Sequence, residues 1–180
     1  MTSVIFGVDC ASFQGHVDWA RVDEVCAFGF SKVSEGTGYI NPYWAAAKPA
    51  MEARRKATWF LPGAYLFLDA SNGTAQADHF AAIAGNLDGW AIAIDVERSA
   101  GSPTMTQARD CVARLRQHYP HHKILGYIPH WYWGGQDTTF TDVLWASGYV
   151  NGSGAPAALY PRVPAASWDG YGGRNPALLQ

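Results

Sequence analysis

Residues 90–97 most constrain the fold, because an unbroken apolar run there ends in two carboxylates, Asp95 and Glu97. Without polar alternation, residues 90–94 predict a strand buried on both faces, typical of a parallel sheet covered by helices. Residues i and i+2 of a strand lie on the same side, so we expect Asp95 and Glu97 to be neighbours roughly 7 Å apart. Ionised carboxylates are costly to bury and repel one another, which favours a catalytic role for this pair.

Strand-like and helix-like segments alternate along the chain. Strands are expected at 4–9, 28–33, 59–68 (interrupted early by Pro62-Gly63), 90–95, 123–128, 143–147 and 165–168. Helices are expected at 17–26, 42–56, 73–85 and 103–118, with Thr74 and Ser102 as candidate N-caps. This order predicts an α/β chain with a parallel sheet and right-handed crossovers. It favours an irregular TIM-like β/α barrel with about five β/α units followed by short strands; an open doubly wound sheet is the alternative.

In such barrels the chemistry lies at the carboxyl ends of the strands. Asp9 falls at one such end, and Asp95 with Glu97 at another. The sequence therefore predicts that these three acids meet, although Asp9 is also compatible with a hydrogen-bonded strand terminus.

Composition narrows the class of protein. With 180 residues and 16% charged residues, the chain is expected to form a single catalytic domain, residues 1–180. The net charge of −2 gives no basic surface for nucleic acid. The three cysteines form no CxxC pair, so we expect no disulfide framework, no metal and no cofactor. The last residues, 176–180, resemble the beginning of a final barrel strand.

Four ordered stretches resemble the family-25 glycoside hydrolases, the muramidase lysozymes of bacteria, fungi and bacteriophage lysins. They are Gly7-Val8-Asp9 with Ser12-Phe13-Gln14-Gly15, Phe30-Ser31-Lys32-Val33-Ser34-Glu35-Gly36, Gly63-Ala64-Tyr65-Leu66-Phe67 and Ala93-Ile94-Asp95-Val96-Glu97. Leu144-Trp145-Ala146 and Leu178-Leu179-Gln180 extend the likeness over nearly the whole chain.

The resemblance implies hydrolysis of the β-1,4 bond between N-acetylmuramic acid and N-acetylglucosamine in bacterial peptidoglycan. It implies that Glu97 is the proton donor and that Asp95 and Asp9 support it. The residues it implies for the sugar cleft are Lys32, Glu35, Tyr39, Tyr65 and Tyr127; Trp131 is a further aromatic candidate. Two departures stand out: Leu66 occupies a position where the family usually has His, and a later family carboxylate is absent unless Asp169 replaces it.

Other interpretations stay open at this point. Asp95-x-Glu97 resembles the end of the family-18 chitinase motif, but Ala91 and Ala93 occupy its preceding acidic positions. A non-catalytic module that binds cell-wall glycans is another alternative. Lys32 and Glu35 are compatible with a plain surface ion pair, and Tyr65, Tyr127 and Trp131 with core packing.

The sequence shows neither a secretory signal nor a membrane span. We therefore expect a monomer that is synthesised in the host cytoplasm, does not insert into membranes and acts on the cell wall after release, as a bacteriophage endolysin does.

Overall fold

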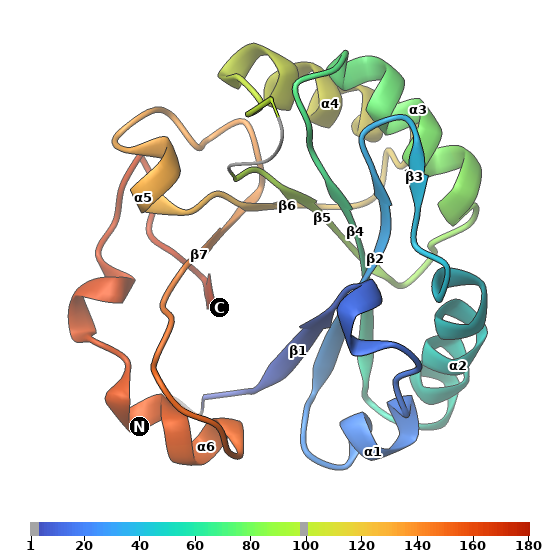
Figure 1. Cartoon of the computed structure of the whole chain (residues 1–180), viewed down its shortest axis with the longest axis vertical. Helices are drawn as coiled ribbons and strands as arrows, with labels where there is room; N and C mark the ends of the chain where they lie inside the picture. The colour runs from blue at the N-terminus through green and yellow to red at the C-terminus, as the bar shows by residue number, and fades with distance from the viewer. Residues whose placement is uncertain (1–3, 98–100) are drawn as a thin grey trace.

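The computed structural model describes residues 4–97 and 101–180. Its described strands form one curled sheet in the order β1-β2-β4-β5-β6-β7-β8 (Figure 1), and all neighbours on this path are parallel. The strands are β1 (Gly7–Cys10), β2 (Phe28–Glu35), β4 (Leu61–Phe67), β5 (Ala91–Asp95), β6 (Ile124–Tyr127), β7 (Val143–Ala146) and β8 (Leu178–Leu179). A short strand, β3 (Tyr39–Ile40), pairs antiparallel with the end of β2. This curled sheet confirms the predicted irregular TIM-like α/β fold.

Helices cover the outside of the sheet (Figure 1). They are α1 (Trp19–Asp23), α2 (Trp44–Ala57), α3 (Gly73–Ala84), α4 (Met105–His118), α5 (His130–Trp133) and α6 (Pro156–Leu159). Two predicted N-caps are wrong. Asn72, not Thr74, caps α3 by accepting a hydrogen bond from the backbone N–H of Ala75. Thr104, not Ser102, caps α4 and forms a reciprocal capping box with Gln107.

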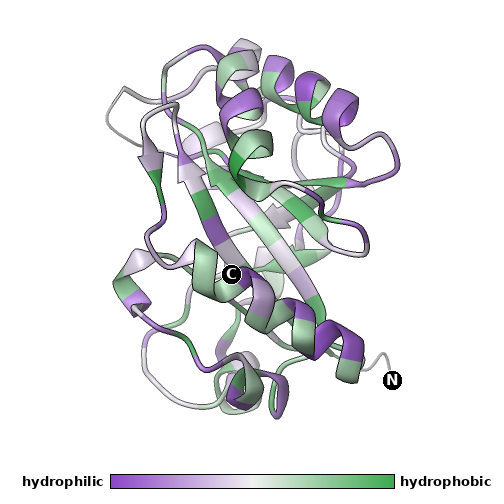
Figure 2. Ribbon diagram, turned by 90° about the vertical axis from the view of Figure 1, so that its right-hand side faces the viewer, coloured by the Kyte–Doolittle hydropathy of each residue, from purple (hydrophilic) through white to green (hydrophobic). Residues whose placement is uncertain are grey.

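Side-chain alternation along the strands builds two apolar layers. On β5, Ile92 and Ile94 point outward and belong to an outer cluster packed beneath the helices. Ala93 points inward and belongs to an inner cluster that fills the barrel: Phe30, Tyr65, Ala93, Leu125, Tyr127 and Trp145. In Figure 2 hydrophobic stretches lie along the strands, and the helices carry both hydrophilic and hydrophobic residues. The apolar run therefore reflects burial on both faces, as the sequence predicted.

Room for the inner cluster comes partly from Gly63 on β4. A Cβ atom there would lie 2.3 Å from the Phe30 ring. The strand β4 includes both Pro62 and Gly63 without a break. The interruption that the sequence predicted at these two residues is therefore wrong.

The barrel is not closed by a complete ladder. In the described part of the chain, β1 and β8 pair with β2 and β7 and not with each other. We call the gap between β1 and β8 the seam; beside it lies a cavity of about 560 Å³ lined by residues from both edges. Residues 165–168 form a 3-10 helix, so the strand predicted there is wrong. Among the described helices, none combines the length and apolarity needed to cross a membrane.

Candidate active site

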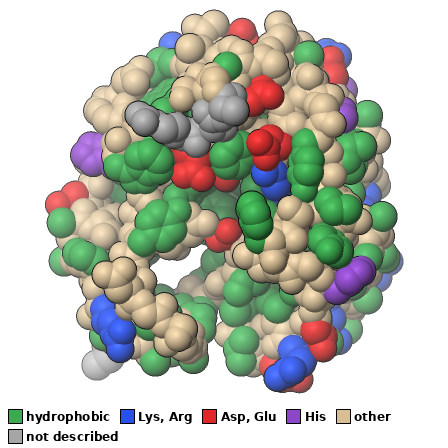
Figure 3. Space-filling model, in the orientation of Figure 1, with side chains coloured by type: hydrophobic (Ala, Val, Ile, Leu, Met, Phe, Trp, Pro, Cys, Tyr) green, Lys and Arg blue, Asp and Glu red, His purple; other side chains and the backbone are tan. Residues whose placement is uncertain are grey.

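The predicted acids meet at the carboxyl end of the barrel. Asp95 is the last residue of β5, two positions beyond the inward-facing Ala93, and the buried Val96 separates it from Glu97. Asp9 lies near the end of β1 on the same inward side. Figure 3 shows acidic side chains gathered beside a hollow at the centre of this face. The charges of Glu97 and Asp9 act on Asp95, and that of Asp9 acts on Glu97, so the three acids lie near one another, as their positions at the carboxyl ends of strands predicted.

Burial dominates the electrostatics of these acids. It raises the pKa of Asp95 well above the usual range, and the negative charges of Glu97 and Asp9 raise it further. Burial also raises the pKa of Glu97, again with help from Asp9. In the described structure, Asp95 Oδ1 is buried without a hydrogen-bond partner. An acid with a raised pKa beside further carboxyl groups is the equipment of a glycoside hydrolase.

Lys32 supplies the positive charge that opposes these shifts. Its ammonium forms an ion pair with Glu35 and lies 4.4 Å from the centre of the Phe67 ring and 5.5 Å from that of Tyr39. The residue is only 8% exposed. It lowers the pKa of both Asp95 and Glu97. A surface ion pair is therefore the wrong description of Lys32, because its charge acts on the buried acids.

Tyr65 and Tyr127 have two environments at once. Both rings belong to the inner cluster, and both side chains are buried. The charges of Asp95 and Glu97 nevertheless raise the pKa of each phenol, after the larger effect of burial. In the sheet register Tyr127 is the direct partner of Asp95. Each ring thus packs in the core, while its hydroxyl lies within electrostatic reach of the acids.

Two residues near the acids were not predicted to take part. Gln180 Nε2 donates hydrogen bonds of 2.9 Å to both carboxylate oxygens of Asp9. Tyr149 donates a 2.6 Å hydrogen bond to Gln180 Oε1, and its own hydroxyl lies 2.6 Å from that of Tyr127. Gln180 follows β8 at an inward position, which its sequence register implied, whereas Tyr149 lies in a segment without any periodic signal.

Other candidates lie away from this cluster. Trp131, on α5, is 59% exposed and packs edge-on against Tyr132. Tyr39 lies at the margin of the site, 37% exposed and beside Lys32. Asp169 is exposed after the 3-10 helix, and within the described chain it has no hydrogen bond or ion pair with the three acids. No contact in the described chain joins Asp169 to the cluster, and its replacement of a missing carboxylate stays a prediction.

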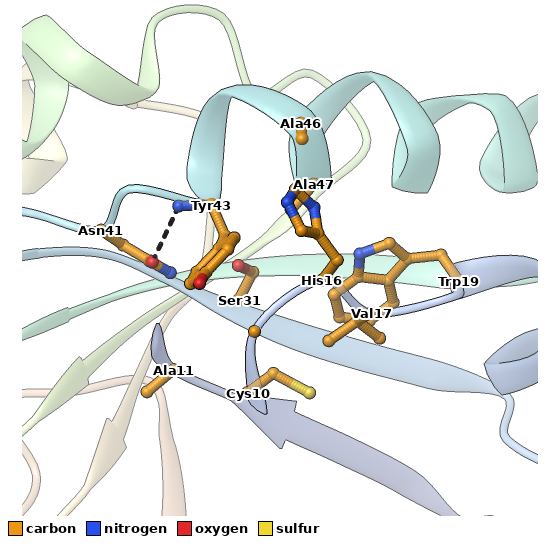
Figure 4. A pocket seen from close by; sticks show the side chains of 11 residues that line it. Cys10, Ala11, His16, Val17, Trp19, Ser31, Asn41, Tyr43, Ala46 and Ala47 are labelled. Atoms are coloured by element: carbon orange, nitrogen blue, oxygen red, sulfur yellow. Dashed lines mark hydrogen bonds between the residues drawn. The ribbon is translucent and has the colours of Figure 1, made fainter. Parts of the chain in front are cut away.

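A small cavity on the outer side of β1 does not offer a second site (Figure 4). Its volume is about 40 Å³, room for a few waters at roughly 10–15 Å³ each, but not for a sugar unit. Cys10 and His16 both line it. Burial, followed by the charge of Asp9, raises the pKa of the Cys10 thiol to about 11. The thiol is therefore protonated at neutral pH, which argues against a cysteine nucleophile.

The described residues contain no group of three or more His, Cys, Asp or Glu side chains arranged to hold a metal ion. The polar side chains around the acids, namely Lys32, Glu35, Tyr149 and Gln180, form hydrogen bonds and ion pairs with protein partners. The site as described is thus a cluster of carboxyl groups with one cation and several phenols.

Comparison with known proteins agrees with this geometry. The family model Glycosyl hydrolases family 25 matches residues 8–169. Lysozyme M1 of Streptomyces globisporus is 35% identical over 92 residues, which are 49% of this chain. The aligned part spans only 29% of that lysozyme's length.

Solved structures share the fold. A family 25 glycosyl hydrolase from Bacillus anthracis aligns with a TM-score of 0.69 and 23% identity, over 85% of this chain and 74% of that one. The bacterial lysozyme from Streptomyces coelicolor aligns with a TM-score of 0.65 and 25% identity, over 88% and 81% of the two chains. Because the family match covers most of the sequence, this chain belongs to glycosyl hydrolase family 25.

Proposed function

We propose that this protein is a lysozyme that hydrolyses the β-1,4 bond between N-acetylmuramic acid and N-acetylglucosamine in peptidoglycan. The observation behind this proposal is the cluster of Asp9, Asp95 and Glu97, whose pKa values are all raised by burial. Family membership favours this function over the chitinase-like and the non-catalytic alternatives.

Glu97 is the proton donor in the proposed reaction. Burial raises its pKa, which favours the protonated form that a general acid needs. The proton moves to the glycosidic oxygen while the bond from that oxygen to the anomeric carbon breaks. This general acid step is worth about two to four orders of magnitude in rate.

The substrate's own 2-acetamido group acts as nucleophile in our proposed route. Its carbonyl oxygen forms a bond to the anomeric carbon as the leaving sugar departs. Water then attacks the same carbon, the bond to the acetamido oxygen breaks, and one proton of the water returns to Glu97. Asp95, whose ionisation is coupled to that of Glu97, holds and polarises the acetamido group in this route. Two displacements at one carbon retain the configuration.

The decisive experiment identifies the new reducing end. Purified cell walls are digested, the products are reduced with borohydride, and the terminal sugar alcohol is identified by mass spectrometry. Muramitol is expected. Glucosaminitol would contradict a muramidase, and release of chitin oligomers by a parallel sample would favour the chitinase alternative. Proton NMR during the first turnovers tests the route, because a first product of inverted configuration excludes it.

We also propose that the protein is a monomer made in a reducing cytoplasm, which reaches the wall after release, as a bacteriophage lysin does. All three cysteines are free and buried, which suits folding without disulfides. The protein is purified without added reductant and then denatured, and titration of its thiols should find three. Detection of the protein outside intact producing cells before lysis would contradict the proposed delivery.

A further inference from the structure

Gln180 joins the two edges of the seam. Its backbone continues the β8 ladder: the Gln180 N–H donates to the Ala146 carbonyl at 2.9 Å, and the Gly148 N–H donates to the main-chain oxygen of Gln180 at 2.8 Å. Its side chain crosses to Asp9, 171 residues away in sequence, and donates to both carboxylate oxygens. In the described chain β1 and β8 share no backbone pairing. This side-chain contact is therefore a direct hydrogen-bonded link between the two edges.

The other half of the amide is also fixed. Oε1 accepts a hydrogen bond from Tyr149, whose oxygen in turn accepts one from the buried Tyr127. An ionised carboxylate has only acceptors, so Nε2 must face Asp9 and Oε1 must face Tyr149. The hydrogen-bond chain from β6 to β1 consequently has one direction, and the amide of Gln180 determines it.

We propose that Gln180 is a positioning residue, whose amide holds the Asp9 carboxylate in place across the seam at the catalytic end of the barrel. This inference rests on the proposed function for its effect on turnover. The effect of Gln180 on the ionisation of Asp9 does not depend on the proposed function.

The expected consequence is electrostatic. Burial raises the pKa of Asp9, and the hydrogen bonds from Gln180 oppose this effect by stabilising the ionised form. The titratable groups whose ionisation is coupled to that of Asp9 are Cys10, Tyr65, Asp95, Glu97 and Tyr149. Since all of them are acids, none offers Asp9 a compensating positive charge. An ionised Asp9 in turn raises the pKa of Glu97, so Gln180 supports the proton donor from a distance.

The test compares three variants with the wild-type protein. Gln180→Leu removes the amide at similar volume, and Gln180→Asn keeps an amide one methylene shorter. Gln117→Leu makes the same change on the exposed face of α4 and serves as the control. NMR titration of the ¹³C-labelled Asp9 carboxyl should show a higher pKa in Gln180→Leu, with no change in Gln117→Leu. If the pKa of Asp9 in Gln180→Asn equals that of the wild-type protein, the amide group matters more than the length of the side chain that carries it.

Turnover provides the second readout. In Gln180→Leu we expect kcat on cell walls to fall by up to about a hundredfold, as for a catalytic group displaced by about 1 Å, while KM changes little. The acidic limb of the kcat/KM profile should move to higher pH together with the Asp9 titration. An unchanged Asp9 titration overturns the proposal. If the Asp9 titration shifts while the acidic limb of kcat/KM and the value of kcat stay unchanged, Gln180 positions Asp9 without any effect on turnover, which overturns its part in catalysis. If digestion by the wild-type protein followed by reduction gives no muramitol, the proposed function fails, while the Asp9 titration still decides whether Gln180 positions this acid.

Discussion

The ammonium of Lys32 lies 4.4 Å from the centre of the Phe67 ring, on the neighbouring strand β4. The same ammonium pairs with Glu35, which is 41% exposed. A cation over an aromatic face gains electrostatic attraction that increases when water is excluded. Lys32 is thus kept near the acids by a ring and a carboxylate, and its charge offsets part of their mutual repulsion.

Replacing Lys32 by Met should shift the pH profile. Lys32 lowers the pKa of Glu97, so its removal should raise this pKa and move the alkaline limb of kcat/KM to higher pH. The variant Lys32→Arg keeps the charge and should leave the limb close to its wild-type position. A limb that moves to lower pH in Lys32→Met would contradict the assigned electrostatics.

Glu97→Gln keeps the size of the side chain and removes its proton. We expect cell-wall clearing to slow by about two to four orders of magnitude, because the general acid is lost. The exposed Glu24, which directly follows α1, offers a matched control, since Glu24→Gln should retain full activity. Clearing by Glu97→Gln at the wild-type rate would show that another group donates the proton.

Asp95→Asn should stabilise the fold while reducing activity. Because burial raises the pKa of Asp95, the folded state holds this proton more tightly than the unfolded chain does. The resulting stabilisation is complete below the unfolded pKa, about 3.9, and is lost as pH rises through the higher folded pKa. At pH 7 the neutral side-chain amide of the variant Asp95→Asn is not ionised, so the variant does not lose this stabilisation.

Calorimetry should therefore give Asp95→Asn a Tm higher than wild type at pH 7, with the difference disappearing near pH 3. A gain of each kcal/mol corresponds to about 2–4 °C for a chain of this size. Asp110→Asn makes the same change at an exposed position on α4 and is the control. A lower Tm for Asp95→Asn at pH 7 would mean that the buried carboxylate is stabilising.

Two substitutions separate the roles of Tyr65. Tyr65→Ala removes a ring from the inner cluster and should lower the free energy of unfolding by about 3–5 kcal/mol, the usual loss for a buried aromatic side chain. Tyr65→Phe keeps the ring and removes the hydroxyl that lies within reach of Asp95 and Asp9. We expect Tyr65→Phe to melt near the wild-type temperature and to have a lower kcat/KM. Unchanged kinetics would leave this residue with a packing role alone.

Much of the fold could be predicted because one physical signal recurs in it. Each main strand is a short apolar run, and its inward positions continue into the polar residues of the site. Asp95, two residues beyond Ala93, is the clearest example. The errors arise where local hydrogen bonds compete. Both Ser102-Pro103 and Thr104-x-x-Gln107 are plausible helix starts, and the capping box of Thr104 is the one formed.

The parts of the site that escaped prediction depend on contacts between distant segments. Tyr149 and Gln180 follow different strands, and their relation to Asp9 exists only once the sheet has curled. The role of Lys32 was similarly ambiguous, because a Lys-x-x-Glu spacing gives no information about burial. Residues 165–168 lack both β-branched residues and alternation, and with Pro164 before them they form a 3-10 helix.

The alternation on β5 has a consequence for the quality of the folded population. A slip of one residue would place Asp95 beneath the helices and turn Ile92 and Ile94 into the barrel. Such a molecule would lose its outer core and could not remain folded, so mispaired but compact species are selected against. The concentration of competent active sites in a preparation should therefore equal the concentration of native molecules, and specific activity becomes a direct gauge of folding yield.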